Sequence, residues 1–177
     1  MPRLSDRVGT FTDSVIRRMT RINNQYDSIN LSQGFPDFDP PKELTDALAK
    51  AAHDGPHQYA VTFGAQNFRE ALAKKTSPAL HHEVDPNTEI CVTCGGTEAM
   101  MAAMMTVANP GDKVIVFSPF YENYGADTIL SGAEPIYVPL NPPEFDFDKQ
   151  ALESAFQEGV KAIIVCNPSN PCGKVFT

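Results

Sequence analysis

Strand-like and helical segments alternate along the second half of the chain, and no other sequence feature limits the possible folds as strongly. Short apolar runs typical of strands occupy residues 89–93, 113–118, 136–140 and 162–166. Helical patterns lie between them, over residues 97–107, 121–130 and 147–156. Strands that alternate with helices form βαβ units, whose sheets are mostly parallel and are covered by helices on both faces. We therefore expect a three-layer α/β/α fold.

The first part of the chain has a different pattern. Apolar residues at helical spacing predict helices over residues 13–25, 42–52 and 68–75. Residues 29–40, with the sequence INLSQGFPDFDP, are interrupted by proline and glycine, which predicts an extended loop.

Composition excludes several classes of protein. The chain is 42% hydrophobic and 20% charged, which is typical of a globular protein. The apolar stretch over residues 99–105 is far shorter than the roughly 18 residues that a membrane span needs. The net charge is -8, and the nearest basic cluster, Arg17, Arg18 and Arg21, is interpreted as the solvated face of a helix. With no apolar leader at the start, we expect a cytoplasmic protein that binds neither membrane nor nucleic acid.

Four cysteines raise the question of zinc or redox chemistry. Cys91 and Cys94 have CxxC spacing, but Cys166 and Cys172 are too widely spaced to complete a zinc site. The CxxC pair also ends a predicted strand, whereas a redox pair opens a helix. We interpret all four residues as buried structural thiols, and we expect no metal site and no disulfide.

A glycine-rich turn, TCGGTEAM, follows the predicted strand over residues 89–93. Gly95 and Gly96 allow a ligand to approach the backbone closely, and the helix that follows points its free N–H groups at the turn. Such a turn holds an anion, usually phosphate, and Thr97 adds a hydroxyl. The spacing matches neither the GxGxxG fingerprint nor the GxxxxGK[ST] loop of nucleotide-binding proteins. The alternative is a tight strand-to-helix turn with Thr97 as the N-cap.

Two further loops follow predicted strands. The sequence PFYENY comes after residues 113–118, and its aromatic rings either stack on a flat ligand or pack in the core. The sequence NPSNPCGK comes after residues 162–166, and its two Asn-Pro pairs predict a stiff loop that presents amide side chains or simply turns the chain. Because the carboxyl ends of parallel strands share one edge of a sheet, the three loops together predict a pocket for a flat ring that carries a phosphate.

The sequence NPSNPCGK resembles the NPxNPxGK signature of the class I/II aminotransferases, the fold type I enzymes that depend on pyridoxal 5'-phosphate. Four other segments are similar to N-terminal blocks of the same family, in the same order: INLSQGFPDFDPP, QYAVTFGAQNFREALAKK, VTCGGTEAM and PFYENY. The likeness is greatest to the kynurenine and methionine aminotransferases. The resemblance implies a homodimeric enzyme that moves an amino group from an amino acid to a 2-oxo acid.

The resemblance also implies roles for five residues at the cofactor. Gly96 and Thr97 would hold the phosphate with backbone amides and a hydroxyl, and Gly95 would shape the turn. Tyr121 would stack on the pyridine ring, and Asn170 would form a hydrogen bond with the 3-oxygen of that ring.

Two more residues have implied roles outside this cluster. Gly34 would lie against the substrate carboxylate, and Tyr59 would reach the phosphate bound by the partner subunit. The sequence departs from the family at two positions: Cys172 replaces the usual threonine, and Cys166 stands where the kynurenine branch often has an asparagine. The second departure bears on the choice of substrate.

By the same resemblance, residues 1–40 would form the N-terminal arm and substrate loop of the small domain. Residues 41–177 would form the first half of the large cofactor-binding domain, incomplete at its C-terminus. The family's Asp-x-x-Tyr strand end and its Ser-x-Ser-Lys loop, which carries the Schiff-base lysine, are not found in the sequence. We therefore expect no catalytic residue here, and we interpret the chain as an N-terminal fragment that is inactive alone. The alternatives are a β-lyase of the same fold and a non-catalytic homologue that binds a partner.

Overall fold

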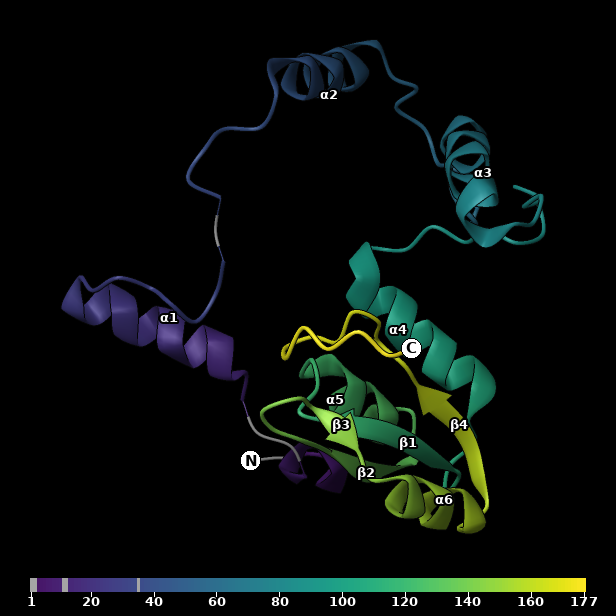
Figure 1. The fold of residues 1–177 in the computed structure, drawn as a ribbon. Coiled ribbons are helices and arrows are strands. Elements are labelled where there is room, and N and C mark those ends of the chain that lie inside the picture. The colour runs from purple at the N-terminus through teal and green to yellow at the C-terminus, as the bar shows by residue number, and fades with distance from the viewer. Residues whose placement is uncertain (1–2, 11–12, 35) are drawn as a thin grey trace. The chain divides into compact units, whose positions relative to one another are not determined.

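The computed structural model describes residues 3–10, 13–34 and 36–177, and the chain divides into two compact units (Figure 1). One unit combines Met1–Ser14 with Cys94–Thr177, and the other is Val15–Thr93. The sequence predicts that residues 1–40 and 41–177 belong to different domains of a whole enzyme. This domain boundary stays a prediction. None of the helices in the described part of the chain is long and apolar enough to cross a membrane.

A four-stranded sheet forms the centre of the unit that contains Cys94–Thr177. Its strands lie in the order β3-β2-β1-β4, with the bounds β1 (Lys113–Ser118), β2 (Glu134–Asn141), β3 (Asp146–Phe147) and β4 (Val160–Ile164). Strand β1 is parallel to β2 and to β4, whereas β3 is antiparallel to β2. The prediction of a mostly parallel sheet is confirmed.

Helices cover both faces of this sheet (Figure 1). Successive side chains of β1 point to opposite faces, because the side-chain period of a strand is two. Val114 packs against Met104 of α4 (Gly95–Val107), on the face that also carries α5 (Asn123–Leu130). Ile115 packs against Ala155 of α6 (Lys149–Gln157) on the other face. The predicted three-layer α/β/α arrangement is confirmed.

Side-chain hydrogen bonds help to place two elements of this unit. Helix α6 begins two residues later than predicted, because Asp148 Oδ1 accepts hydrogen bonds from the N–H groups of Gln150 and Ala151, at 2.7 and 3.3 Å. Near the N-terminus, the 3-10 helix η1 (Asp6–Gly9) is tied to α5, since Arg7 Nη1 donates to the carbonyl of Leu130 at 2.9 Å.

The strand predicted over residues 89–93 is wrong. Residues 90–93 belong to no helix or strand, and the backbone N–H of Val92 donates to the carbonyl of Phe63 at 3.0 Å. A strand exists through its ladder of hydrogen bonds, and no strand of the described residues pairs with this segment. The apolar residues 89–93 therefore favour an extended backbone, but no strand of the described residues lies beside them to form a ladder.

The unit Val15–Thr93 contains the three helices that the sequence predicts: α1 (Val15–Tyr26), α2 (Lys42–Asp54) and α3 (Gln66–Leu80). Arg69 of α3 is buried, and its Nε donates to the carbonyl of Gly64 at 3.0 Å while Nη1 donates to that of Pro86. Gly64 has φ +107°, and a Cβ there would lie 2.4 Å from Cγ2 of Val92. Only glycine fits this position.

Candidate functional site

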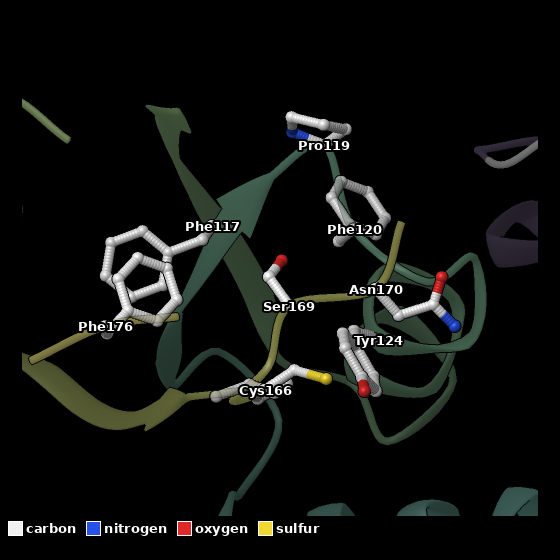
Figure 2. Close-up of a pocket in the computed structure, with 9 residues that line it drawn as sticks. Phe117, Pro119, Phe120, Tyr124, Cys166, Ser169, Asn170 and Phe176 are labelled. Carbon is white, nitrogen blue, oxygen red and sulfur yellow. The ribbon is translucent and has the colours of Figure 1, made fainter. Parts of the chain in front are cut away.

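The carboxyl ends of β1 and β4 meet at a small pocket (Figure 2). Because the two strands are parallel neighbours, the chains that leave Ser118 and Ile164 emerge at the same edge of the sheet. The pocket is lined by residues of both loops and strand ends: Phe117, Pro119, Phe120, Tyr124, Ile164, Cys166, Ser169, Asn170 and Phe176. The structure therefore brings two of the three predicted loops together.

Hydrogen bonds across the base of the NPSNPCGK loop hold this loop in place. The side chain of Asn167 donates to the carbonyl of Phe176 at 3.1 Å and accepts from the N–H of the same residue at 3.0 Å. Ser169 is buried, and its N–H donates to the carbonyl of Lys174 at 2.7 Å. The loop is thus fixed at both ends, and the exposed amide side chain of Asn170 lies at the pocket.

Of the three aromatic residues after β1, Phe120 and Tyr124 line the pocket and Tyr121 does not. The ring of Phe120 is stacked on that of Tyr137, with centroids 5.2 Å apart and planes inclined by 4°. Tyr121 is half-buried and meets Tyr124 edge to face at 5.8 Å. Packing, the alternative from the sequence, therefore accounts for Phe120. The stacking role of Tyr121 stays a prediction.

Tyr124 and Cys166 lie side by side in the wall of the pocket, where Figure 2 shows the phenol beside the sulfur. The interaction with the neighbouring Cys166 thiol and burial raise the pKa of Tyr124 to about 12. Burial favours the neutral phenol, because a charged group loses its hydration when it is buried. The Cys166 thiol in turn donates to the carbonyl of Pro168 at 3.3 Å. Sequence reasoning missed Tyr124, although it lies inside the PFYENY block.

The glycine turn forms the first turn of helix α4. The helix begins at Gly95 with Cys94 as its N-cap, so the alternative of Thr97 as N-cap is wrong. Gly95 has φ +83°, in the left-handed region that favours glycine. A Cβ at Gly95 or Gly96 would meet no atom within 4 Å, so the space beside the turn is open.

Asn123 connects this turn to the aromatic loop. Its side-chain Nδ2 donates to the hydroxyl of Thr97 at 2.7 Å, across 26 positions of sequence. Asn123 is the first residue of α5 and Thr97 lies in the first turn of α4. The sequence analysis missed Asn123, because no pattern in the sequence indicates which residue of α5 meets the glycine turn.

Gly34 and Tyr59 belong to the other unit, Val15–Thr93. Both are exposed, and a Cβ at Gly34 would meet nothing within 4 Å. Phe35, in the same predicted loop as Gly34, lies outside the described residues. The roles expected for Gly34 and Tyr59 involve a substrate and a partner subunit, and they stay predictions.

The interpretation of the cysteines as buried is wrong. Cys91 and Cys94 are exposed, Cys166 and Cys172 are half-buried, and all four are free thiols. Burial acts to raise the pKa of Cys172, but hydrogen bonds with Ser169 and the backbone, together with the charge of Lys174, outweigh burial and lower that pKa. Among the described residues, no group of three or more His, Cys, Asp or Glu side chains could hold a metal ion.

The family model for aminotransferase class I and II matches residues 26–177. The chain belongs to the class I and II aminotransferase family. A methionine aminotransferase of Escherichia coli is 38% identical over 163 residues, which cover 92% of this chain and 42% of that protein. Kynurenine–oxoglutarate transaminase 3 of Rattus norvegicus is 35% identical over 182 residues, which cover 97% of this chain and 40% of that protein.

Solved aminotransferase structures have the same fold. A methionine aminotransferase of Escherichia coli matches all of this chain and 46% of its own, with a TM-score of 0.88 and 35% identity. An N-succinyldiaminopimelate aminotransferase of Mycobacterium tuberculosis matches 99% of this chain and 46% of its own, with a TM-score of 0.89 and 33% identity. The predicted family and its α/β fold are confirmed. This member of the family spans less than half the length of each relative.

Proposed function

We propose that the protein carrying this chain transfers amino groups from an amino acid to a 2-oxo acid, with pyridoxal 5'-phosphate as its cofactor. One observation carries the proposal. In a member of the aminotransferase family, the glycine turn of α4 is bonded to the loop after β1, and that loop shares a pocket with NPSNPCGK. The relatives support the same class of reaction, because their names describe aminotransferases.

The first turn of α4 is suited to the phosphate of this cofactor. The first N–H groups of a helix have no carbonyl partner within the helix, and the positive end of the helix dipole attracts an anion. The open space beside Gly95 and Gly96 allows an anion to approach these amides. Gly96 and Thr97 would hold the phosphate, with Gly95 shaping the turn.

The two loops at the pocket are suited to the ring. Tyr121 would stack on the pyridine ring, and the exposed amide of Asn170 would form a hydrogen bond with the ring's 3-oxygen. When bound, the cofactor acts as an electron sink for the reacting carbon of the substrate. We assign the proton transfer itself to no residue of this chain.

The proposal extends to the substrate and to a second subunit. Gly34 would lie against the substrate carboxylate, and Tyr59 would reach the phosphate held by the partner subunit of a homodimer. The exposure of both residues is compatible with contacts to another molecule. We also propose that the protein works in the cytoplasm.

The test is an assay of the protein carrying this chain, supplied with pyridoxal 5'-phosphate, methionine or an aromatic amino acid, and a panel of 2-oxo acids. The expected result is a new amino acid formed from the oxo acid. Elimination products without amino transfer would show that the protein is a β-lyase and would overturn the proposal. Cofactor binding without turnover of any substrate would show that the protein is a non-catalytic homologue and would likewise overturn the proposal.

A further inference from the structure

The hydrogen bond between Asn123 and Thr97 fixes the direction in which the threonine hydroxyl donates. Asn123 Nδ2 lies 2.7 Å from Thr97 Oγ1 and donates to it. A hydroxyl has one proton to donate and two lone pairs to accept with. Because the amide N–H occupies a lone pair, the threonine proton points away from Asn123 and stays available to another acceptor.

We propose that Asn123 is a positioning residue for phosphate binding, which acts by holding the Thr97 hydroxyl as a donor toward a phosphate group at the start of α4. The inference rests on the proposed function, since the phosphate is that of pyridoxal 5'-phosphate. Asn123 would not touch the cofactor, and it would act only through Thr97.

Asn123 is itself held firmly enough for this role. It opens α5, where the N–H of Tyr124 donates to the carbonyl of Tyr121 at 3.0 Å. One turn later, the hydroxyl of Thr128 donates to the carbonyl of Tyr124 at 2.7 Å. Tyr124 of this helix also lies beside Cys166 of the loop after β4 in the wall of the pocket (Figure 2). The amide of Asn123 therefore extends from a fixed backbone.

The chemistry of an amide, and not only its size, is required here. An aspartate has nearly the same shape but only acceptor atoms when ionised. At position 123 it would accept the proton of Thr97 and turn the hydroxyl away from the phosphate. It would also add a negative charge beside Glu122, next to an anion site. Asn123→Asp therefore separates a directed donor from simple packing.

The test measures the dissociation constants of pyridoxal 5'-phosphate and of pyridoxal, which lacks the phosphate, by absorbance titration of the protein carrying this chain. The variants are Asn123→Ala, Asn123→Asp, Thr97→Val, and Thr97→Val combined with Asn123→Ala. Gln157→Ala, an exposed amide on α6, is the matched control. Circular dichroism and the thermal midpoint of each variant report whether it is folded.

We expect Asn123→Ala to weaken binding of pyridoxal 5'-phosphate roughly threefold to tenfold, and Asn123→Asp to weaken it more. Binding of pyridoxal should stay unchanged in both, as should all binding in the control. In the double variant the loss should equal that of Thr97→Val alone, because Asn123 acts through Thr97.

The outcomes separate the inference from the proposed function. Unchanged cofactor affinity in Thr97→Val would remove Thr97 from the proposed site, and the inference with it. A loss in Thr97→Val without a loss in Asn123→Ala would overturn the inference alone, as would equal losses for pyridoxal and its phosphate in Asn123→Ala. If Asn123→Ala does not fold, Asn123→Asp decides, and unchanged affinity in that variant overturns the inference.

Discussion

The phenol of Tyr124 lies beside the thiol of Cys166 in the wall of the pocket, where helix α5 faces the loop after strand β4 (Figure 2). Cys166 stands where the kynurenine branch of the family often has an asparagine, so the chain departs from the family at this position. The structure shows that the thiol at this position donates to the carbonyl of Pro168 and lies beside the phenol of Tyr124, so the pocket accommodates the departure.

Removing the thiol should release the Tyr124 phenol. Cys166→Ala takes away the neighbouring thiol that contributes most to the raised pKa, so the pKa of Tyr124 should fall from about 12 toward 10.0. The measurement is the ultraviolet absorbance of tyrosinate during an alkaline titration, with Tyr124→Phe to identify the signal. The pKa is raised in the folded state, so the stability due to Tyr124 is fully present below pH 10.0 and is lost as the pH rises through about 12. An unchanged titration in Cys166→Ala would show that the thiol does not raise the pKa of Tyr124.

Asp127 should destabilise the fold at neutral pH. Its side chain is 4% exposed, Oδ2 has no partner among the described residues, and burial raises its pKa above 3.8. The stability that the protonated carboxyl contributes is therefore fully present below pH 3.8 and is lost as the pH rises through the folded-state pKa. Asp127→Asn should raise the free energy of unfolding at pH 7 by about 1 kcal/mol and flatten its pH dependence. Urea unfolding across this pH range measures both effects, and a loss of stability at pH 7 would show that the carboxylate has a partner.

Substitution of Gly96 should weaken cofactor binding without unfolding the protein. A Cβ at Gly96 would meet no protein atom within 4 Å, so a side chain there has room unless a ligand occupies the space. Gly96→Val should weaken binding of pyridoxal 5'-phosphate several-fold or more, since a hydrogen bond to a charged group contributes about 1.5–3 kcal/mol. Gly9→Val, at a glycine with equally open surroundings, is the control. Equal affinity in both variants would refute the phosphate site.

Tyr121 should contribute to cofactor binding through its ring. Tyr121→Ala is expected to weaken binding of pyridoxal 5'-phosphate and to shift its absorbance, because the stacked ring changes the cofactor's surroundings. Phe120→Ala is the informative comparison, since Phe120 stacks on Tyr137 and should affect the thermal midpoint first. Retention of both affinity and spectrum in Tyr121→Ala would leave Tyr121 as a packing residue.

Arg69 should be essential to the stability of the unit Val15–Thr93. Its guanidinium is buried and donates to the carbonyls of Gly64 and Pro86. Arg69→Ala leaves these acceptors without a donor and opens a cavity, so it should lower the free energy of unfolding by about 2–3 kcal/mol. Lys74→Ala, at an exposed position of the same helix, should change it by less than about 0.5 kcal/mol. Denaturant unfolding of both variants checks the difference.

Residues 1–177 expressed by themselves should associate and should not catalyse amino transfer. Strand β4 ends the described sheet, and Ile163 and Val165 are 37% and 58% exposed. Uncovered apolar side chains beside an edge strand favour aggregation or binding to another chain. Light scattering and a thermal melt measure this, and a monomer that melts sharply and transfers amino groups would contradict the prediction.

The parallel sheet and its helices were predictable because each depends on periodicity within one segment. Strand β1 was predicted with its exact observed bounds, since an apolar run bordered by turn residues needs no information from elsewhere in the chain. The predicted start of helix α6 is two residues too early. The side chain of Asp148 caps the helix, and the spacing of apolar residues does not indicate a capping residue.

The failures share one physical cause, which is dependence on a distant partner. Residues 89–93 have the composition of a strand, but a strand also needs a neighbour to complete its ladder. The burial of Cys91 and Cys94 likewise depends on what packs over them, and both are exposed.

The sequence by itself determined the fold class, the family and the three loops that carry the candidate site, because these follow from local pattern and from motifs in order. Only the tertiary structure decided that Asn123 meets Thr97 and that Tyr124 meets Cys166. The first pair depends on how α5 packs against α4, and the second on how α5 lies against the loop after β4. The geometry of that packing comes from the whole core, so no short segment of the sequence records it.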